Sequence, residues 1–221
     1  MPEDHAMQIA IIGAGNVGRA LATSLTRAGH DVTITAEHAE NAAAAATETG
    51  ATAGTSNTDA ATNAQVVVLA VPAQSIGQIA SAMGTSLDGK VVVDVANRPT
   101  PTADGGATSI AEELQNRLPR ARVIKAFNTV FASRQAEPQI AGISSDGFVA
   151  GDDATAKQTV LDIVESIGFR PVDAGSLAGA RTLEGMAWLN ISRNMAGGSW
   201  QDAWVLVGPD SLTATDSDSR N

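Results

Sequence analysis

Residues 8–35, QIAIIGAGNVGRALATSLTRAGHDVTIT, decide the fold of this protein. The apolar run Gln8–Ile12 predicts a buried strand, and the glycine-rich turn Gly13–Gly18 follows it directly. The next residues have the spacing of a helix over 16–28, and a second strand is expected over 31–35. Because the Gly-x-Gly-x-x-Gly motif lies between the strand and the helix of one βαβ unit, it predicts a dinucleotide-binding site.

Each glycine of this turn has its own expected role. Gly13 permits the tight turn, Gly15 lets the backbone approach a pyrophosphate, and Gly18 lets the helix pack closely on the strand. The N-terminus of the helix would then face the phosphates. We predict that the pyrophosphate is bound by Gly13, Ala14, Gly15, Asn16, Val17 and Gly18. A turn that is only structural is the alternative interpretation.

The rest of the chain alternates between β-branched runs and alanine-rich helical stretches. We expect further strands at Val66–Ala70, Val91–Asp94, Arg122–Ala126, Gly147–Ala150 and Arg170–Asp173. We expect helices at Ala39–Thr49, Ala73–Met83, Ser109–Leu118 and Ala154–Ser166. This order predicts an α/β fold of the doubly wound type, with a mainly parallel sheet whose strands are buried on both faces.

The segment after Asp173 has a different character. Residues 176–196 are predicted to be mostly helical, with Leu183, Met186, Ala187 and Ile191 spaced for burial. The polar, acidic residues from about 210 are expected to be disordered. We therefore predict a dinucleotide-binding domain over 1–174. Residues 175–221 would form a small segment that packs on the active site or on a second subunit.

The end of the second strand bears on the choice of cofactor. Glu37 lies 19 residues after Gly18, close to the spacing of about 20 for an acid that binds the ribose 2′-hydroxyl. A carboxylate at that place repels a 2′-phosphate, which favours NAD over NADP. We assign the ribose end of the site to Thr35, Ala36, Glu37 and His38. The alternatives are that Glu37 caps the following helix and that His38 is only a surface histidine.

The turns after later strands are expected to border the same crevice, because the carboxyl ends of parallel strands meet at one edge of the sheet. These turns contain Ala70, Val71 and Pro72, then Asn97, and then Phe127, Asn128 and Thr129. We place the last three near the nicotinamide and the second substrate. The competing interpretation makes Phe127 a core residue and gives Asn128 a hydrogen bond within its loop. No histidine is expected at this end, so the histidine acid–base chemistry of many dehydrogenases has no candidate residue there.

Composition excludes several classes of function. The chain has 221 residues, no cysteine and only three histidines, so disulfides and a metal site are not expected. A net charge of −10 argues against nucleic acid and leaves small molecules as the expected partners. The chain has no apolar run of membrane-spanning length and no basic, apolar leader, so we expect a cytoplasmic protein. The excess of acidic over basic residues indicates either a protein from a high-salt proteome, where negative charge maintains solubility, or a biased genomic composition.

Several strings along the chain resemble a known family. Beside the glycine turn they are Gly106–Leu118, Pro119–Thr129, Gly151–Asp153, Asp173–Leu177, Ala180-Arg181 and Leu183-Glu184. Their order and spacing resemble NADPH-dependent reductases of coenzyme F420 over nearly the whole chain. The stretch Lys125–Thr129 is also similar to the reductase domain of the STEAP metalloreductases, relatives that have a membrane portion as well.

The resemblance implies a Rossmann domain with a small C-terminal element, a homodimer, and hydride transfer between nicotinamide C4 and deazaflavin C5. Such a transfer depends on positioning of the two rings, so no catalytic acid or base is expected. The resemblance also implies that Ala70–Pro72 and Asn97 border the dinucleotide and that Phe127–Thr129 approach the nicotinamide and the substrate. One departure concerns the cofactor. The family commonly has serine and arginine at the positions of Ala36 and Glu37, a pair that holds the 2′-phosphate of NADP. We therefore predict that NAD(H) is used at least as well as NADP(H).

Two other functions remain open from the sequence. The chain could be a nucleotide sensor that binds the dinucleotide and signals through its C-terminal segment, without catalysis. It could also be an imine reductase resembling pyrroline-5-carboxylate reductase. That enzyme would need a long helical dimerisation domain, for which the roughly 45 residues after Asp173 are few.

Overall fold

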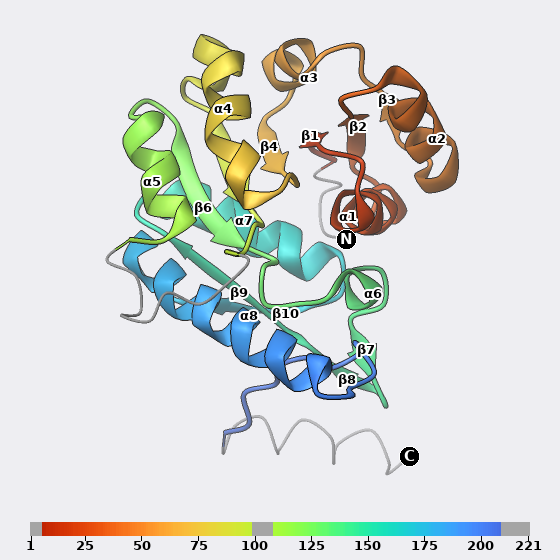
Figure 1. Ribbon diagram of the computed structural model, residues 1–221, viewed down its shortest axis with the longest axis vertical. Coiled ribbons are helices and arrows are strands. Elements are labelled where there is room, and N and C mark those ends of the chain that lie inside the picture. Colours follow the sequence, from red (N-terminus) through yellow and green to blue (C-terminus); the bar gives the residue numbers. More distant parts are fainter. Residues whose placement is uncertain (1–5, 99–107, 209–221) are drawn as a thin grey trace.

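The computed structural model describes residues 6–98 and 108–208. An eight-stranded sheet of order β10-β9-β6-β5-β4-β1-β2-β3 forms its centre, and helices cover both faces (Figure 1). The strands are β1 (Gln8–Ile12), β2 (Asp31–Thr35), β3 (Thr52–Ala53), β4 (Val66–Leu69), β5 (Val91–Asp94), β6 (Arg122–Ala126), β9 (Asp146–Gly151) and β10 (Arg170–Asp173). Strands β9 and β10 run opposite to the other six, since β9 pairs antiparallel with β6 and parallel with β10.

The helices alternate with the strands as expected. They are α1 (Asn16–Arg27), α2 (Ala39–Thr49), α3 (Asn57–Asn63), α4 (Ala73–Met83), α5 (Ile110–Arg117), α6 (Ala132–Gln135), α7 (Ala154–Ser166) and α8 (Ala180–Met195), with 3-10 turns η1 (Gly84–Leu87) and η2 (Leu177–Gly179). A capping box joins Ser109 and Glu112 at the start of α5, because the serine hydroxyl accepts from the Glu112 amide and the Glu112 carboxylate accepts from the Ser109 amide.

The predicted doubly wound, mainly parallel fold is confirmed, and strand alternation explains the two halves of its core. In β1, Ile9 and Ile11 pack among α1, α2 and α7, whereas Ala10 and Ile12 pack among α3, α4 and α5. Central strands of this kind need apolar residues at every position because helices cover both faces. The same alternation fixes which side chains of neighbouring strands can meet.

Five short helices and strands were not expected from the sequence. They are β3, α3, α6 and a separate hairpin of β7 (Gln139–Ile140) and β8 (Ile143–Ser144). Helix α3, with the sequence NTDAATN, has no apolar stripe, and the Ser56 side chain that caps it is the main local signal. The expectation that the predicted strands are buried on both faces is wrong for β10, because this strand closes the sheet at one edge and is partly exposed. The other edge strand, β3, is exposed.

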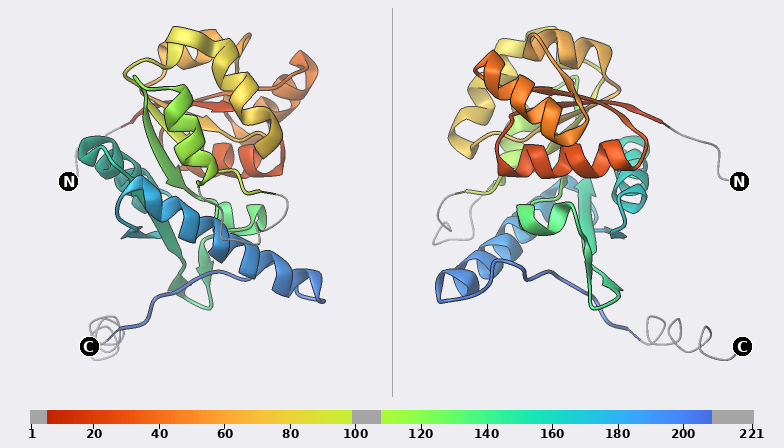
Figure 2. Two further views of the ribbon diagram at one scale, coloured as in Figure 1. Left: turned by 60° about the vertical axis from the view of Figure 1, so that its left-hand side comes forward. Right: turned by 90° about the vertical axis from the view of Figure 1, so that its right-hand side faces the viewer.

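Residues 176–196 are mostly helical, as predicted, and α8 lies across the β9 side of the sheet (Figure 2). Leu183 of α8 packs with Phe148 and Ala150 of β9, and Met186 and Trp204 cover this small cluster. Beyond α8 the chain returns along β9, where the amide of Asp146 donates to the carbonyl oxygen of Trp204 at 2.8 Å. The predicted disordered tail lies outside the described residues.

Candidate functional site

The glycine turn between β1 and α1 is closely packed at Gly13 and Gly18 and open at Gly15. Gly13 adopts a φ of 115°, and a Cβ atom there would lie 2.3 Å from the carbonyl oxygen of Ala70. A Cβ atom on Gly18 would lie 1.9 Å from the carbonyl oxygen of Gly13, so the turn and the helix are in close contact. Gly15 is different, because no atom lies within 4 Å of its Cβ position. The turn therefore leaves open space in front of the first amides of α1, where an anion is favoured.

A cavity of about 900 Å³ lies over this turn and the carboxyl ends of β1 and β4. Of the residues predicted from the sequence, its wall contains Gly13, Ala14, Gly15, Ala36, Glu37, Ala70, Val71 and Pro72. Its volume lies within the range typical of sites for small molecules and cofactors. The structure thus brings together the glycine turn, the end of β2 and the turn after β4.

The cavity wall also contains polar residues that the sequence analysis missed: Arg19, Asn41, Asn57, Thr58, Ser75 and Gln78. Arg19 lies one turn into α1, where side chains point back toward the helix N-terminus and hence toward the cavity. Its Nε donates to the carbonyl oxygen of Ala14 at 2.9 Å, and its Nη1 pairs with Glu48 of α2. A cation directly after Gly18 was the local signal for this position. Arg19 and Glu37 give the wall opposite charges.

The other predicted dinucleotide contacts are not part of this wall: Asn16, Val17, Gly18, Thr35, His38, Asn97 and Asn128. Thr35 is buried, and its hydroxyl donates to Asn57 Oδ1 at 2.7 Å. His38 is the exposed N-cap residue of α2 and makes no side-chain capping bond, while the acid in the first turn of this helix is Glu40. Glu37 precedes the cap residue and is part of the cavity wall.

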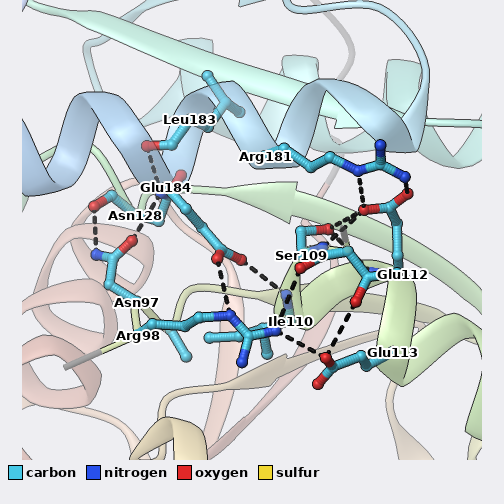
Figure 3. Close-up of polar contacts among 12 residues, drawn as sticks. Asn97, Arg98, Ser109, Ile110, Glu112, Glu113, Asn128, Arg181, Leu183 and Glu184 are labelled. Carbon is cyan, nitrogen blue, oxygen red and sulfur yellow. Dashed lines mark hydrogen bonds and ion pairs between the residues drawn. The ribbon is translucent and has the colours of Figure 1, made fainter. Parts of the chain in front are cut away.

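Asn97 and Asn128 form a reciprocal pair where β5 and β6 end (Figure 3). Asn97 Nδ2 donates to the carbonyl oxygen of Asn128 at 2.8 Å, and Asn128 Nδ2 donates to Asn97 Oδ1 at 2.9 Å. Asn128 Nδ2 also donates to the carbonyl oxygen of Leu183 in α8 at 3.0 Å. The pair therefore joins the two strand ends to the C-terminal helix.

Phe127 precedes this pair in a conformation that few residues adopt. Its φ is 61°, in the left-handed region, and its ring is buried in the core on the α1 and α7 side of the sheet. Thr129 is also buried, and its hydroxyl has no hydrogen-bond partner among the described residues. Backbone strain of this kind is often found next to functional sites. It fixes the direction in which Asn128 leaves β6.

Residues 6–98 and 108–208 contain neither a candidate metal-binding cluster nor a helix of membrane-spanning character. No three His, Asp or Glu side chains there stand close enough together to hold a metal ion. None of the helices in that part is both long and apolar enough to cross a membrane.

Comparison with known proteins gives a consistent result. Residues 8–98 match the family described as NADP oxidoreductase, coenzyme F420-dependent. The F420-dependent NADP reductase of Methanothermobacter marburgensis is 32% identical over 211 residues, which cover 86% of this chain and 93% of that protein. The metalloreductase STEAP3 of Rattus norvegicus is 31% identical over 185 residues, but these cover 81% of this chain and only 36% of STEAP3. The chain thus spans about a third of that relative.

A solved structure extends the likeness to the fold. The protein from Arthrobacter sp. FB24 that is provisionally described as an F420-dependent NADP reductase superposes with a TM-score of 0.81 at 29% identity, over 91% of this chain and all of the other. Both sequence and structure therefore match along nearly the whole length. The chain belongs to the family of coenzyme F420-dependent NADP oxidoreductases, and it is a nicotinamide-dependent oxidoreductase.

Proposed function

We propose that this protein transfers a hydride between a nicotinamide dinucleotide and a deazaflavin such as coenzyme F420, or a flavin-like acceptor. The observation that carries this proposal is the open glycine turn at the N-terminus of α1, within a cavity large enough for a cofactor. The names of the relatives that match over their full length support the choice of acceptor. Hydride transfer itself is chemistry of the two cofactors, so the protein has to hold their rings in contact.

The described residues can be assigned to binding the dinucleotide and to holding the nicotinamide end of the crevice. The first amides of α1 and the open backbone at Gly15 would bind the pyrophosphate. Glu37 would accept hydrogen bonds from the adenosine ribose, and Arg19 would add positive charge near the phosphates. At the other end, the Asn97 and Asn128 pair would fix the edge of the crevice near the nicotinamide.

The choice between NAD(H) and NADP(H) is a separate part of the proposal. The family name favours NADP(H), whereas an acid at position 37 disfavours a 2′-phosphate. Arg19 on the same wall offers a cation, but Glu48 already shares its charge. We therefore propose that NAD(H) is used at least as well as NADP(H).

One experiment tests the reaction directly. The protein is mixed anaerobically with coenzyme F420 and with NADH or NADPH, and the absorbance of the deazaflavin is followed. We expect stoichiometric bleaching of F420 with matching oxidation of the nicotinamide. Tight dinucleotide binding without oxidation, whichever acceptor is offered, would favour the sensor. Oxidation that requires a cyclic imine in place of F420 would favour an imine reductase, although the described chain after β10 contains only the short turn η2, one long helix and a segment without regular secondary structure.

A homodimer and a cytoplasmic location are further proposals. The outer side of α8 and the segment after it expose apolar side chains: Leu189, Met195, Leu206 and Val207, each at least half exposed. Such a surface favours a partner subunit. Light scattering should give twice the monomer mass of 22.4 kDa, and a monomer at micromolar concentration would refute the dimer. Cell fractionation tests the location.

A further inference from the structure

Three charged side chains are buried together where α8 meets the sheet. Asp94 and Lys125 are register partners on β5 and β6, and neither side chain is exposed to solvent. Glu184 of α8 covers them and is 12% exposed. Lys125 Nζ donates to Asp94 Oδ2 at 2.8 Å and to Glu184 Oε1 at 3.1 Å. A buried ammonium is tolerated only with such partners, so the lysine needs both carboxylates.

This buried cluster of Asp94, Lys125 and Glu184 fixes the loop that follows β5. Lys125 Nζ also donates to the carbonyl oxygen of Ala96 at 2.5 Å, and the amide of Ala96 donates to Asp94 Oδ1 at 2.8 Å. Both polar backbone atoms of Ala96 are therefore held by the cluster. The next residue is Asn97, so the cluster determines where the Asn97 amide lies against Asn128.

Helix α8 contacts the same loop at a second point. The carbonyl oxygen of Leu183 accepts from Asn128, and the adjacent Glu184 reaches Arg98, whose Nε lies 3.7 Å from Glu184 Oε2 (Figure 3). Glu184 Oε1 also accepts from the amide of Ile110 at the start of α5, at 2.8 Å. Two adjacent residues of α8 thus bind the strand ends and the start of α5.

We propose that Glu184 is a positioning residue for hydride transfer. Through Lys125 and Arg98 it fixes Asn97 and Asn128 at the nicotinamide end of the crevice, so that α8 completes the active site. This inference rests on the proposed function, because the nicotinamide must approach the Asn97 and Asn128 pair. None of the three residues of the buried cluster is part of the cavity wall over the glycine turn, so loss of the cluster should affect the rate of transfer and leave dinucleotide affinity largely unchanged.

The structure provides a matched control. Arg181, one turn before Glu184 on α8, donates through its Nε to Glu112 Oε2 at 2.8 Å and so also attaches α8 to α5. Arg181 contacts neither Lys125 nor the asparagine pair. Replacing Arg181 weakens the attachment of α8 without removing the buried cluster. Comparing this variant with a variant at Glu184 therefore separates the docking of α8 from the positioning of the asparagine pair.

The test compares Glu184→Gln with Arg181→Ala. For Glu184→Gln we expect at least a 10-fold fall in kcat for the reduction of F420 and less than a 3-fold change in the Kd of the dinucleotide, measured by calorimetry. The side-chain amide protons of Asn128, followed by NMR, should exchange with solvent faster than in the wild type. Arg181→Ala should leave kcat within about 3-fold and the exchange unchanged.

A second variant at the same position keeps the inference testable if Glu184→Gln does not fold. Glu184→Asp keeps the charge but withdraws the carboxylate by one methylene, and we expect an intermediate loss of kcat with faster Asn128 exchange. The inference is overturned if folded Glu184→Gln or Glu184→Asp keeps the wild-type kcat and exchange, or if Arg181→Ala loses as much kcat as Glu184→Gln. If the wild type transfers no hydride to F420, the proposed function fails, and the exchange at Asn128 alone decides whether Glu184 positions it.

Discussion

Replacement of Glu37 by glutamine should raise the affinity for NADPH without a matching gain for NADH. Glu37 is exposed on the cavity wall, where the ribose of the dinucleotide is expected. Two unit charges about 4 Å apart repel by ~1 kcal/mol in water and ~4 kcal/mol at an effective dielectric constant near 20. Because the carboxylate is exposed, we expect a value near the lower limit, which corresponds to about a 5-fold change in Kd.

The charges of Arg19 and its partner Glu48 also influence the Kd for NADPH. Arg19 would attract a 2′-phosphate, but its guanidinium already pairs with Glu48 and is partly covered. We therefore expect wild-type protein at low salt to bind NADPH no more tightly than NADH. The double change Ala36→Ser with Glu37→Arg replaces a repulsion with a bidentate attraction, and it should shift the ratio of the two Kd values toward NADPH by about 30-fold or more.

The assay is calorimetric titration with NADH and NADPH at low and high ionic strength. In about 1 M salt the Debye length falls to roughly 3 Å, so the effect of Glu37 should nearly vanish. Glu40→Gln is the matched control, since Glu40 is also an exposed acid, in the first turn of α2, but is not part of the cavity wall. The reasoning would be refuted if the wild type bound NADPH tightly and NADH weakly, with Kd values that do not depend on salt, and if Glu37→Gln left both Kd values unchanged.

Three other substitutions test the site and its support. Gly15→Val should abolish dinucleotide binding, because the side chain would fill the open space at the turn; unchanged affinity in a folded variant, by calorimetry, would make the turn structural only. Asn128→Ala should lower turnover about 100-fold with a much smaller loss of affinity, and equal losses would assign Asn128 to cofactor binding. The Arg181 guanidinium lowers the pKa of Glu112 to about 2, so the pair stabilises the fold above pH 4.5 and this contribution is lost as the pH falls toward 2. Glu112→Gln should therefore lower the unfolding free energy at pH 7 by no more than about 1 kcal/mol, because Arg181 is exposed, and the difference should disappear near pH 2 in denaturant titrations; a constant difference would contradict the assignment.

The local patterns of the sequence determined most of the secondary structure. The strand Gln8–Ile12, the turn after it and the capping box at Ser109 follow from properties of a few neighbouring residues, and the structure has them where the sequence predicts them. The helical segment after Asp173 follows from its apolar spacing in the same way. Such signals depend on φ angles and on periods of 2 and 3.6 residues, which are visible without knowledge of the fold.

The local sequence patterns predicted only part of the candidate site. The sequence assigns Glu37 and Gly13–Gly15 to the cofactor site, and these residues are part of the cavity wall, but it gives no role to Arg19, whose place depends on where α1 and α2 lie relative to the crevice. It placed Asn97 and Asn128 at one sheet edge, and the hydrogen bonds between them came only from the packing of the strand ends.

The buried cluster shows most clearly what only the tertiary structure decided. The sequence gives Lys125 as a charged residue in an apolar strand, a position where an unpaired ammonium would be very unfavourable. Its partners Asp94 and Glu184 lie 31 and 59 residues away along the chain. Strand register brings the first opposite Lys125, and the docking of α8 brings the second over it. No local pattern encodes these contacts, because they depend on how whole elements pack against one another.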